Sequence, residues 1–394
     1  MDAVATNSAN EQTTMPNFHP QPVLAALILA AGYSSRMGQF KPLLPLDGKS
    51  VIESAIDAFR NAGITRISVV TGHETAQLQP LLKTRGIPVV HNPDYASGMY
   101  SSVQAGIKSL SEDIDACFLL PADIPLVRPA TVKTMIGRYE SRHPSIIYPV
   151  FQGRRGHPPL IARSLFAEIL AGDGAGGLRA LLQRHQAEAS EVDVFDEGIL
   201  LDMDTPEDYA RLAELAPRRH VPTAAECEAI LAVLAVPDKI CRHSHAVAAV
   251  AEAMTKRLNA HGVIIAPDLV HAGSLLHDIA KGQPAHAEAG AAIVSQLGFP
   301  EVADIIEQHM DIDFKGDTPR EAAIVFLADK LVQEDRRVSV EERFRRAFER
   351  FRDQPEALRG ATRKYDTALA ILGAVERLAG EPLTKILADC EVPA

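Results

Sequence analysis

Short apolar runs alternate with amphipathic helical patterns through the first half of the chain. The runs expected to form buried strands are LAALILA (24–30), RISVVTG (66–72), IPVVHN (87–92), ACFLLPAD (116–123) and SIIYPVF (145–151). Helical patterns lie between them; one spans 51–63, where Ser50 and Glu53 form a capping box and Gly63 is placed to end the helix. This alternation predicts an α/β fold with a doubly wound, mostly parallel, Rossmann-like sheet.

Beyond Tyr209 the pattern changes, because β-branched runs become scarce and long Ala- and Leu-rich helical patterns continue to residue 394. One helical face consists of His243, Val247, Val250, Met254 and Leu258. Similar stripes recur near Leu275 and Val325. The second half is therefore predicted to be all-α.

A chain of 394 residues exceeds what one hydrophobic core usually organises, so two domains are expected. The Asn-, Thr-, Gln- and Pro-rich residues 1–22 are predicted to be a disordered tail, with an α/β domain over 23–215. The segment APRRHVP, residues 216–222, is predicted to be the linker to a helical domain over 223–394.

Charge and cysteine content exclude several classes of protein. The net charge of −11 provides no basic field for nucleic acid, so any anionic ligand must be held by local groups. The four cysteines form neither a CxxC pair nor a disulfide framework, which fits a reducing compartment and a cytoplasmic location. The longest apolar run, 24–31, is too short to span a bilayer, which needs about 20 residues, so no membrane partner is expected.

A glycine- and serine-rich loop follows the first predicted strand and carries two cations, Arg36 and Lys41. Its small residues allow close approach of the backbone to a ligand, and its N–H groups can hold phosphate oxygens. The loop matches neither GxxxxGK[ST] nor GxGxxG, and taken alone it could equally be a solvated turn. Its place after a strand favours a ligand site, because ligands of open parallel sheets bind beyond the carboxyl ends of the strands.

Six ordered motifs over residues 24–215 resemble the MobA-like nucleotidyltransferase family, and the LAAG start is similar to its cytidylyltransferase branch. The motifs are LAAGYSSRMGQFKPLLPL, NPDYASGMYSSVQAG, PADIPL, GRRGHPPL, GDGAGGLRALL and LLDMDTPEDY. The resemblance implies nucleotide binding by Ala31, Gly32, Ser34, Ser35, Arg36, Gly38, Lys41, Ser97, Gly98 and Ser101. It implies catalytic roles for Arg36, Lys41 and Asp123, with Asp123 binding Mg²⁺, and contact of Arg155, Gly156 and His157 with the acceptor.

Either Asp202 or Asp204 could be the second magnesium ligand, and we predict Asp204. The competing interpretation of DTPED is a helix N-cap with proline in the first turn. His157 is a substrate candidate only through its position in RGHP, since a lone histidine is more often structural.

The second half places histidine and aspartate inside apolar helical patterns at RHSHAVAAVA, LLHDIAK, AHAEAGA, IIEQHM and FLADKL. A helical bundle builds metal sites in this way, and imidazole with carboxylate suits Fe, Mn, Co or Zn. The series resembles the HD phosphohydrolase superfamily. That resemblance implies one or two metal ions held by His243, His277, Asp278, His286, His309 and Asp329, with Asp278 catalytic and Lys281 facing a phosphate. For His245, His261 and His271 we favour structural roles.

The resemblances together imply an enzyme that transfers CMP from CTP, or another nucleoside triphosphate, to a molybdopterin acceptor and releases pyrophosphate. Its product would be received by a molybdoenzyme apoprotein or a chaperone. The fused HD domain would hydrolyse a nucleotide or another phosphoester. Two alternatives stay open: a different phosphorylated acceptor, and a nucleotide-sensing or cofactor-delivery protein with a regulatory HD domain.

Overall fold

The computed structural model describes residues 21–33 and 37–392, so the predicted tail lies outside the described residues except for its last two. An eight-stranded sheet forms the N-terminal part, in the order β10-β7-β9-β6-β1-β4-β5 with β8 on β7. Its strands are β1 (Leu24–Ala30), β4 (Arg66–Thr71), β5 (Val89–His91), β6 (Ala116–Pro121), β7 (Ile146–Phe151), β8 (Arg154–Arg155), β9 (Leu160–Ala162) and β10 (Ala189–Asp193). The hairpin strands β2 (Pro45–Leu46) and β3 (Lys49–Ser50) stand apart from it.

Strand β1 lies parallel between β4 and β6, whereas β9 runs antiparallel to both β6 and β7. The prediction of a mostly parallel α/β sheet is confirmed. Helices and 3-10 turns connect the strands: α1 (Val51–Arg60), α2 (Thr75–Thr84), α3 (Met99–Lys108), α4 (Pro129–Arg142), α5 (Phe166–Ala171), α6 (Gly177–Arg184), α7 (Pro206–Leu215), η1 (Lys41–Leu43), η2 (Tyr95–Ser97), η3 (Arg163–Leu165), η4 (Gln186–Glu188), η5 (Glu197–Leu200) and η6 (Ala216–Arg218).

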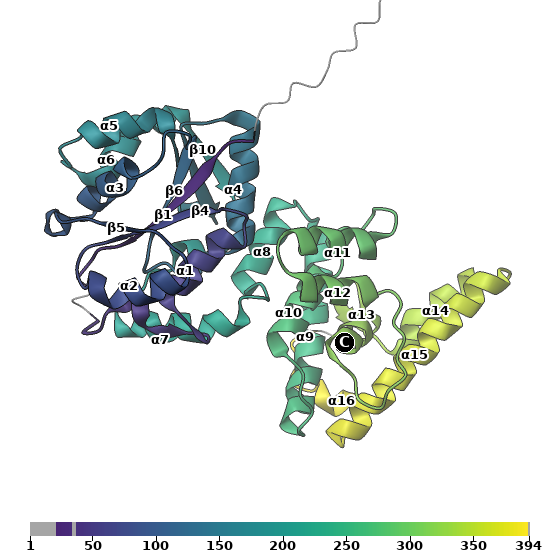
Figure 1. Cartoon of the computed structure of the whole chain (residues 1–394). Coiled ribbons are helices and arrows are strands. Elements are labelled where there is room, and N and C mark those ends of the chain that lie inside the picture. Colours follow the sequence, from purple (N-terminus) through teal and green to yellow (C-terminus); the bar gives the residue numbers. More distant parts are fainter. Residues whose placement is uncertain (1–20, 34–36, 393–394) are drawn as a thin grey trace, which may run out of the picture.

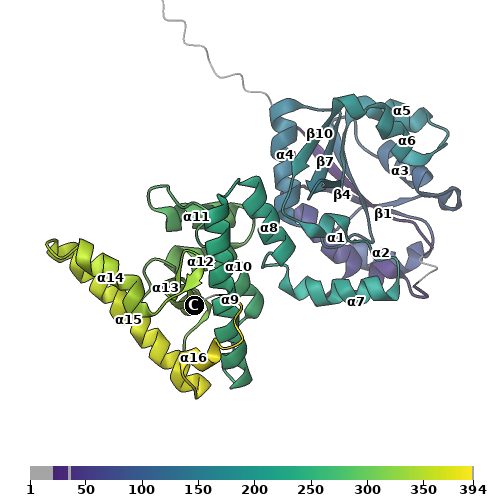
Figure 2. The same ribbon diagram turned by 180° about the vertical axis from the view of Figure 1, so that it is seen from behind.

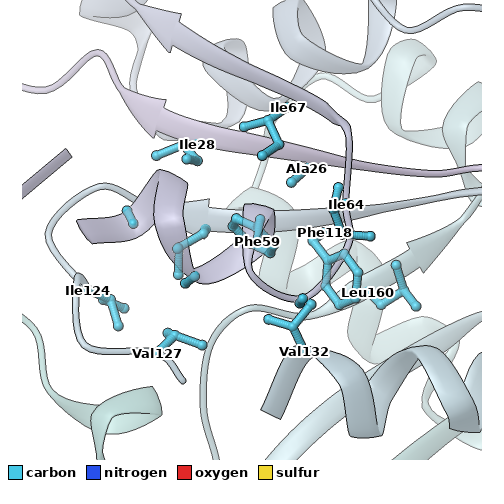
Figure 3. Packing of buried hydrophobic residues seen from close by; sticks show 14 of the residues in the cluster. Ala26, Ile28, Phe59, Ile64, Ile67, Phe118, Ile124, Val127, Val132 and Leu160 are labelled. Atoms are coloured by element: carbon cyan, nitrogen blue, oxygen red, sulfur yellow. The ribbon is translucent and has the colours of Figure 1, made fainter. Parts of the chain in front are cut away.

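Helices cover both faces of the sheet because successive side chains of a strand point to opposite faces. Ala26 and Ile28 of β1 pack with α1, α2 and α4. On the same face, the rings of Phe59 and Phe118 pack against each other, with their centroids 5.5 Å apart. Figure 3 shows these residues. Leu27 packs instead with α3, α5 and α6. The predicted capping box of Ser50 and Glu53 begins α1, and the amide of Gly63 bonds to the carbonyl of Arg60. The doubly wound prediction is therefore confirmed in both layering and local detail.

The C-terminal part is helical except for a two-stranded ladder of β11 (Val332–Gln333) and β12 (Arg336–Arg337). Its helices are α8 (Ala224–Val233), α9 (Asp238–Ala260), α10 (Pro267–Leu276), α11 (His286–Gln296), α12 (Pro300–Gln308), α13 (Glu321–Lys330), α14 (Val340–Arg350), α15 (Pro355–Ala379) and α16 (Leu383–Ile386). The predicted face of α9 is buried at all five positions, and α13 is buried from Ala323 to Lys330. No described helix is both long and apolar enough to cross a bilayer.

Helix α8 lies between the two parts, as both views of the chain show (Figures 1 and 2). The residues predicted as a linker, 216–222, begin with η6 and remain in contact with both sides. The carbonyl of Arg219 accepts a hydrogen bond from Arg128 of the N-terminal part, and Arg218 pairs with Asp268 of the C-terminal part at 3.0 Å. These contacts join the two parts, and beside them lies a cavity of about 1190 Å³ that residues of both parts line, among them Arg128, Glu226 and His271.

Candidate functional site

Two clusters of charged side chains lie in the two parts of the chain. The first, the lysine–aspartate cluster, consists of Lys41, Asp123 and Asp204. The Lys41 Nζ atom is 2.8 Å from Asp204 Oδ1 and 3.6 Å from Asp123 Oδ2. Lys41 begins η1, Asp123 follows β6, and Asp204 precedes α7. Residues far apart in sequence therefore meet beyond the carboxyl end of the central strands, where parallel sheets bind ligands.

The carboxyl group of Asp123 is in an environment that opposes its charge. Burial raises its pKa, the Lys41 ammonium opposes that rise, and the carboxylates of Asp204 and Asp202 add to it. A divalent cation would relieve this repulsion. The donor set suits Mg²⁺, which takes one or two carboxylates and leaves its other positions to water and substrate phosphates.

The two interpretations of DTPED apply to different residues. Thr205 caps α7, its hydroxyl accepting from the amide of Asp208, whose carboxylate completes a capping box, and Pro206 occupies the first turn. Asp204 lies just before this cap, with its side chain on Lys41. Of the two candidates, Asp204 has a carboxylate in contact with Lys41, whereas Asp202 is exposed and acts on Asp123 through its charge.

The glycine- and serine-rich loop after β1 is described only in part, because Ser34, Ser35 and Arg36 lie outside the described residues. On its flanks, Ala31 is buried and its carbonyl accepts from the amide of His73. Gly32 is exposed, and Gly38 adopts a φ of 64°, a conformation that favours glycine.

The segment of Ser97, Gly98 and Ser101, which was predicted to bind the nucleotide, is organised by Asn92, a residue not predicted from the sequence. Its buried amide donates to the hydroxyls of Ser101, at 2.9 Å, and Ser102, at 3.0 Å. The Ser101 hydroxyl also lies 2.8 Å from the carbonyl of Gly98, while Ser97 is exposed at the end of η2. The Ser101 side chain therefore holds the loop in shape. The available signal was an amide placed directly after a strand.

The predicted acceptor residues separate in the structure. Gly156 packs against Ile199 so closely that a Cβ atom would lie 2.6 Å from the Ile199 carbonyl oxygen. The amide of His157 donates to that same carbonyl, and its buried Nδ1 atom has no hydrogen-bond partner. Burial lowers the pKa of His157, and Asp202 opposes the shift. The structure does not bring Arg155 to the lysine–aspartate cluster, because its guanidinium pairs with Glu191 at 2.5 Å and packs over the ring of Tyr148.

The second cluster, the histidine–aspartate cluster, consists of all six residues predicted as metal ligands in the C-terminal part. They come from α9, the end of α10, the start of α11, the end of α12 and α13. Asp278 is central: its carboxylate oxygens lie near the Nε2 atoms of four histidines, at 3.9 Å from His243, 3.3 Å from His277, 3.4 Å from His286 and 3.6 Å from His309. Asp329 Oδ1 lies 3.0 Å from His243 Nε2.

Backbone carbonyls orient three of these imidazoles. The Nδ1 atom of His243 lies 2.7 Å from the carbonyl of Glu334, that of His277 lies 2.7 Å from Ser274, and that of His309 lies 2.6 Å from Ile306. Because a carbonyl can only accept, each Nδ1 donates its proton, and Nε2 is the atom that a neutral ring would offer to a metal. The second hydrogen bond of metal-binding histidines has this function.

Four of the buried polar atoms that face the centre of the cluster have no hydrogen-bond partner. The buried Nε2 atoms of His277, His286 and His309 and the Oδ1 atom of Asp278 make no hydrogen bond. Buried polar atoms are almost always satisfied, and here several electron-pair donors face one another instead. A metal ion would satisfy them all, so the residues present fit divalent metal binding.

Ligand atoms group into two overlapping trios, one of His243, His277 and Asp278 and the other of Asp278, His286 and His309. Within each trio the atoms lie within 4.8 Å of one another. The shared carboxylate is the arrangement that a bridged pair of ions requires.

Three cations border the histidine–aspartate cluster. Lys281 Nζ lies 2.5 Å from Asp278 Oδ2, and Lys330 Nζ lies 2.6 Å from Asp329 Oδ2. Arg343 of α14 approaches Asp329 at 3.9 Å. Burial would raise the pKa of Asp278, but His277 and His309 hold it well below its usual range. Sequence reasoning missed Lys330, which directly follows Asp329, and Arg343, which only the fold brings near it.

Comparison with known proteins identifies both parts. Residues 26–189 match the MobA-like NTP transferase domain, and residues 240–333 match the HD domain. The molybdenum cofactor cytidylyltransferase of Escherichia coli is 30% identical over 191 residues, covering 48% of this chain and 94% of that protein. The chain belongs to the MobA-like NTP transferase family and carries an HD domain.

The transferase domain is also similar to proteins that are named for other activities. The nicotine blue oxidoreductase of Paenarthrobacter nicotinovorans is 28% identical over 200 residues, covering 48% of this chain and 97% of that protein. A nucleotidyl transferase structure from Methanothermobacter thermautotroptrophicus is 25% identical, covers 50% of this chain and 98% of that chain, and has a TM-score of 0.44. The lysine–aspartate cluster belongs to the transferase domain and the histidine–aspartate cluster to the HD domain.

Proposed function

We propose that the transferase domain transfers CMP from CTP to a molybdopterin acceptor with Mg²⁺ and releases pyrophosphate. The observation that carries the proposal is the convergence of Lys41, Asp123 and Asp204 beyond the carboxyl end of β1 and β6. The identity to the Escherichia coli molybdenum cofactor cytidylyltransferase supports the choice of nucleotide and acceptor. Asp123 and Asp204 would hold the ion, which supplies positive charge to the phosphates when bound.

The remaining groups bind and orient the substrates. An acceptor phosphate oxygen attacks the α-phosphorus while the bond between that phosphorus and its bridging oxygen to the β-phosphate breaks, so pyrophosphate leaves. Fixed cations stabilise the charge on the leaving group, a role that fits Lys41 and Arg36. The loop of Ala31, Gly32 and Gly38 and the segment of Ser97, Gly98 and Ser101 would enclose the nucleotide.

Gly156 and His157 would contact the acceptor, since they border the segment that leads to Asp204. Arg155 is left out, because the guanidinium is already paired with Glu191. A molybdoenzyme apoprotein or a chaperone would receive the product. The free cysteines fit a cytoplasmic location, and we retain the divisions 23–215 and 223–394 for the two domains.

For the HD domain we propose hydrolysis of a nucleotide or another phosphoester at one or two ions of Fe, Mn, Co or Zn. The set of four imidazoles and two carboxylates suits these metals. Asp278 would bridge the ions, and Lys281 with Arg343 would bind the phosphate. Bound metal at such a site supplies a hydroxide nucleophile at neutral pH.

The test uses the full chain with Mg²⁺, molybdenum cofactor and each of the four nucleoside triphosphates in turn, and measures pyrophosphate. We expect release with CTP only when the acceptor is present. Better release with GTP would overturn the cytidylyl assignment but not the transferase. Phosphoester hydrolysis is then screened with nucleotides and dinucleotides in the Asp123→Asn variant, in which nucleotidyl transfer is expected to be strongly reduced.

A further inference from the structure

Helix α8 belongs to two hydrophobic cores. Its residue Ala229 packs in the cluster on the α1 and α4 face of the sheet. Cys227, Ile230 and Leu231 pack instead with α9, α10 and α12 of the HD domain. A helix that is apolar on several sides is buried, and α8 is buried between the sheet side and the helical domain. Its one buried carboxylate, Glu226, is 1% exposed.

Glu226 binds two groups of the transferase domain. Its Oε1 atom accepts a 2.8 Å hydrogen bond from the amide of Glu197 and a short one from Arg128 Nη1. Its Oε2 atom accepts from Arg128 Nη2 at 3.0 Å and from the amide of Thr223. Arg128 is 7% exposed and lies over the ring of Phe299 in the HD domain. The pair is therefore a buried ionic contact across the domain junction.

The amide held by Glu226 begins the segment that leads to the lysine–aspartate cluster. Asp196 fixes its start, accepting from the amides of Arg128 and Gly198. In the middle, the Ile199 carbonyl accepts from His157. At the end, the amide of Met203 donates to the carbonyl of Asp123 at 3.0 Å. Residues 196–204 thus form a strap fixed at each end, with Asp204 as its last residue.

We propose that Glu226 is a positioning residue for the transferase site: through Glu197 and Arg128, a carboxylate of α8 sets the place of Asp204. The kinetic part of this inference rests on the proposed function. Without the Glu226 carboxylate, the Glu197 amide loses its acceptor. Arg128 then keeps Asp196, 3.6 Å from its Nη1 atom, and backbone carbonyls, so the strap would shift as these groups rearrange. The effect would appear as weaker Mg²⁺ binding, because residues behind metal ligands affect metal affinity.

The test compares Glu226→Gln with Glu228→Gln in the full chain. Glu228 lies on the same helix but pairs at the surface with His245. We expect the Mg²⁺ concentration for half-maximal pyrophosphate release to rise about tenfold in the first variant only. Phosphoester hydrolysis should be unchanged in both, and amide hydrogen exchange in peptides covering 197–204 should be faster only in Glu226→Gln.

Proportional loss of both activities, or an unchanged Mg²⁺ dependence, would overturn the proposal. If Glu226→Gln does not fold, Glu226→Asp takes its place; it keeps the charge for Arg128 but is too short to hold the Glu197 amide, and the same two outcomes decide. If the unchanged chain releases no pyrophosphate from any nucleotide, the proposed function fails. Hydrogen exchange then decides alone: faster exchange supports the strap, and unchanged exchange overturns it.

Discussion

The histidine–aspartate cluster lies inside a helical bundle, whereas the lysine–aspartate cluster lies on loops at the edge of a sheet. The side chains of His277 and Asp278 are 0% and 2% exposed, while those of Asp123 and Asp204 are 31% and 42% exposed. In the first cluster the donors are already oriented by backbone carbonyls. In the second, Lys41 lies between the carboxylates.

This difference indicates two uses of metal. Imidazole donors fixed in a closed site favour an ion that stays with the protein. Carboxylates on an open edge favour an ion that arrives with a nucleotide and retains several waters. The HD domain should therefore keep its metal through purification, and the transferase domain should depend on added Mg²⁺.

The largest expected effect comes from Asp278→Ala, which removes the carboxylate shared by both trios. We expect loss of the bound transition metal and a drop in phosphoester hydrolysis of more than about a hundredfold. Pyrophosphate release by the transferase domain should be retained. Metal analysis and both assays check this, with His245→Ala as the control, because that ring pairs with Glu228 outside the cluster. Metal content equal to that of the control would remove Asp278 from the ligand set.

Asp123→Asn should have the converse effect. We expect nucleotidyl transfer to fall about a hundredfold, because the lost charge acts on the transferring phosphate, while phosphoester hydrolysis is unchanged. Steady-state pyrophosphate release measures the loss. A matched pair sharpens the result: Asp204→Asn should lower transfer more than Asp202→Asn, since the Asp204 carboxylate lies 2.8 Å from Lys41 Nζ. Equal effects would mean that the ion does not distinguish the two carboxylates.

Gly198→Ala tests the strap of residues 196–204, which leads from the Glu226 contact to the lysine–aspartate cluster. A Cβ atom there would lie 2.1 Å from the carbonyl oxygen of Leu126, so the backbone must move. We expect the free energy of unfolding to fall by about 1–3 kcal/mol. Gly137 of α4 is the control, because a Cβ atom there meets nothing within 4 Å and alanine should stabilise the helix by about 0.5–1 kcal/mol. Urea unfolding measures both, and a destabilisation shared by the two variants would contradict this account.

The smallest expected effect concerns His157, whose pKa is lowered by burial. As pH falls below about 6.5, the unfolded chain binds a proton that the folded His157 does not, so stability decreases until the folded pKa is reached. In His157→Gln this contribution is absent, and the free energy of unfolding should fall less steeply with acid, by at most about 1.4 kcal/mol per pH unit. Unfolding curves between pH 7.5 and about 5 check the slope. An equal change in the exposed control His261→Gln would argue against a specific effect.

Much of this fold is visible in the sequence because the relevant signals are local. The apolar run of β1, the capping box at Ser50 and the buried face of α9 each depend on residues a few positions apart. The reversed strand β9, which lies between β6 and β7 in the sheet, is different. It has three residues, and so short a run carries no periodicity that distinguishes antiparallel from parallel pairing.

The same distinction holds for the sites. His277 and Asp278 stand in a recognisable motif, so the sequence could indicate them as metal ligands. Arg343 could not be predicted, because only the tertiary structure brings it near Asp329. Asn92 and Lys330 lie close in sequence to their partners Ser101 and Asp329, but their residue types alone do not specify these contacts. Glu226 is the extreme case, since its partner Arg128 lies in the other domain.

Helix α8 gives the fusion a practical consequence. A protease cut within 216–222, or a gene fragment that stops there, would strip Ala229 from the sheet side and leave apolar surface open on both fragments. Exchange of one half for a homologue would have to preserve this helix as well. The two domains would therefore have to be separated or exchanged together with the apolar surfaces that cover α8.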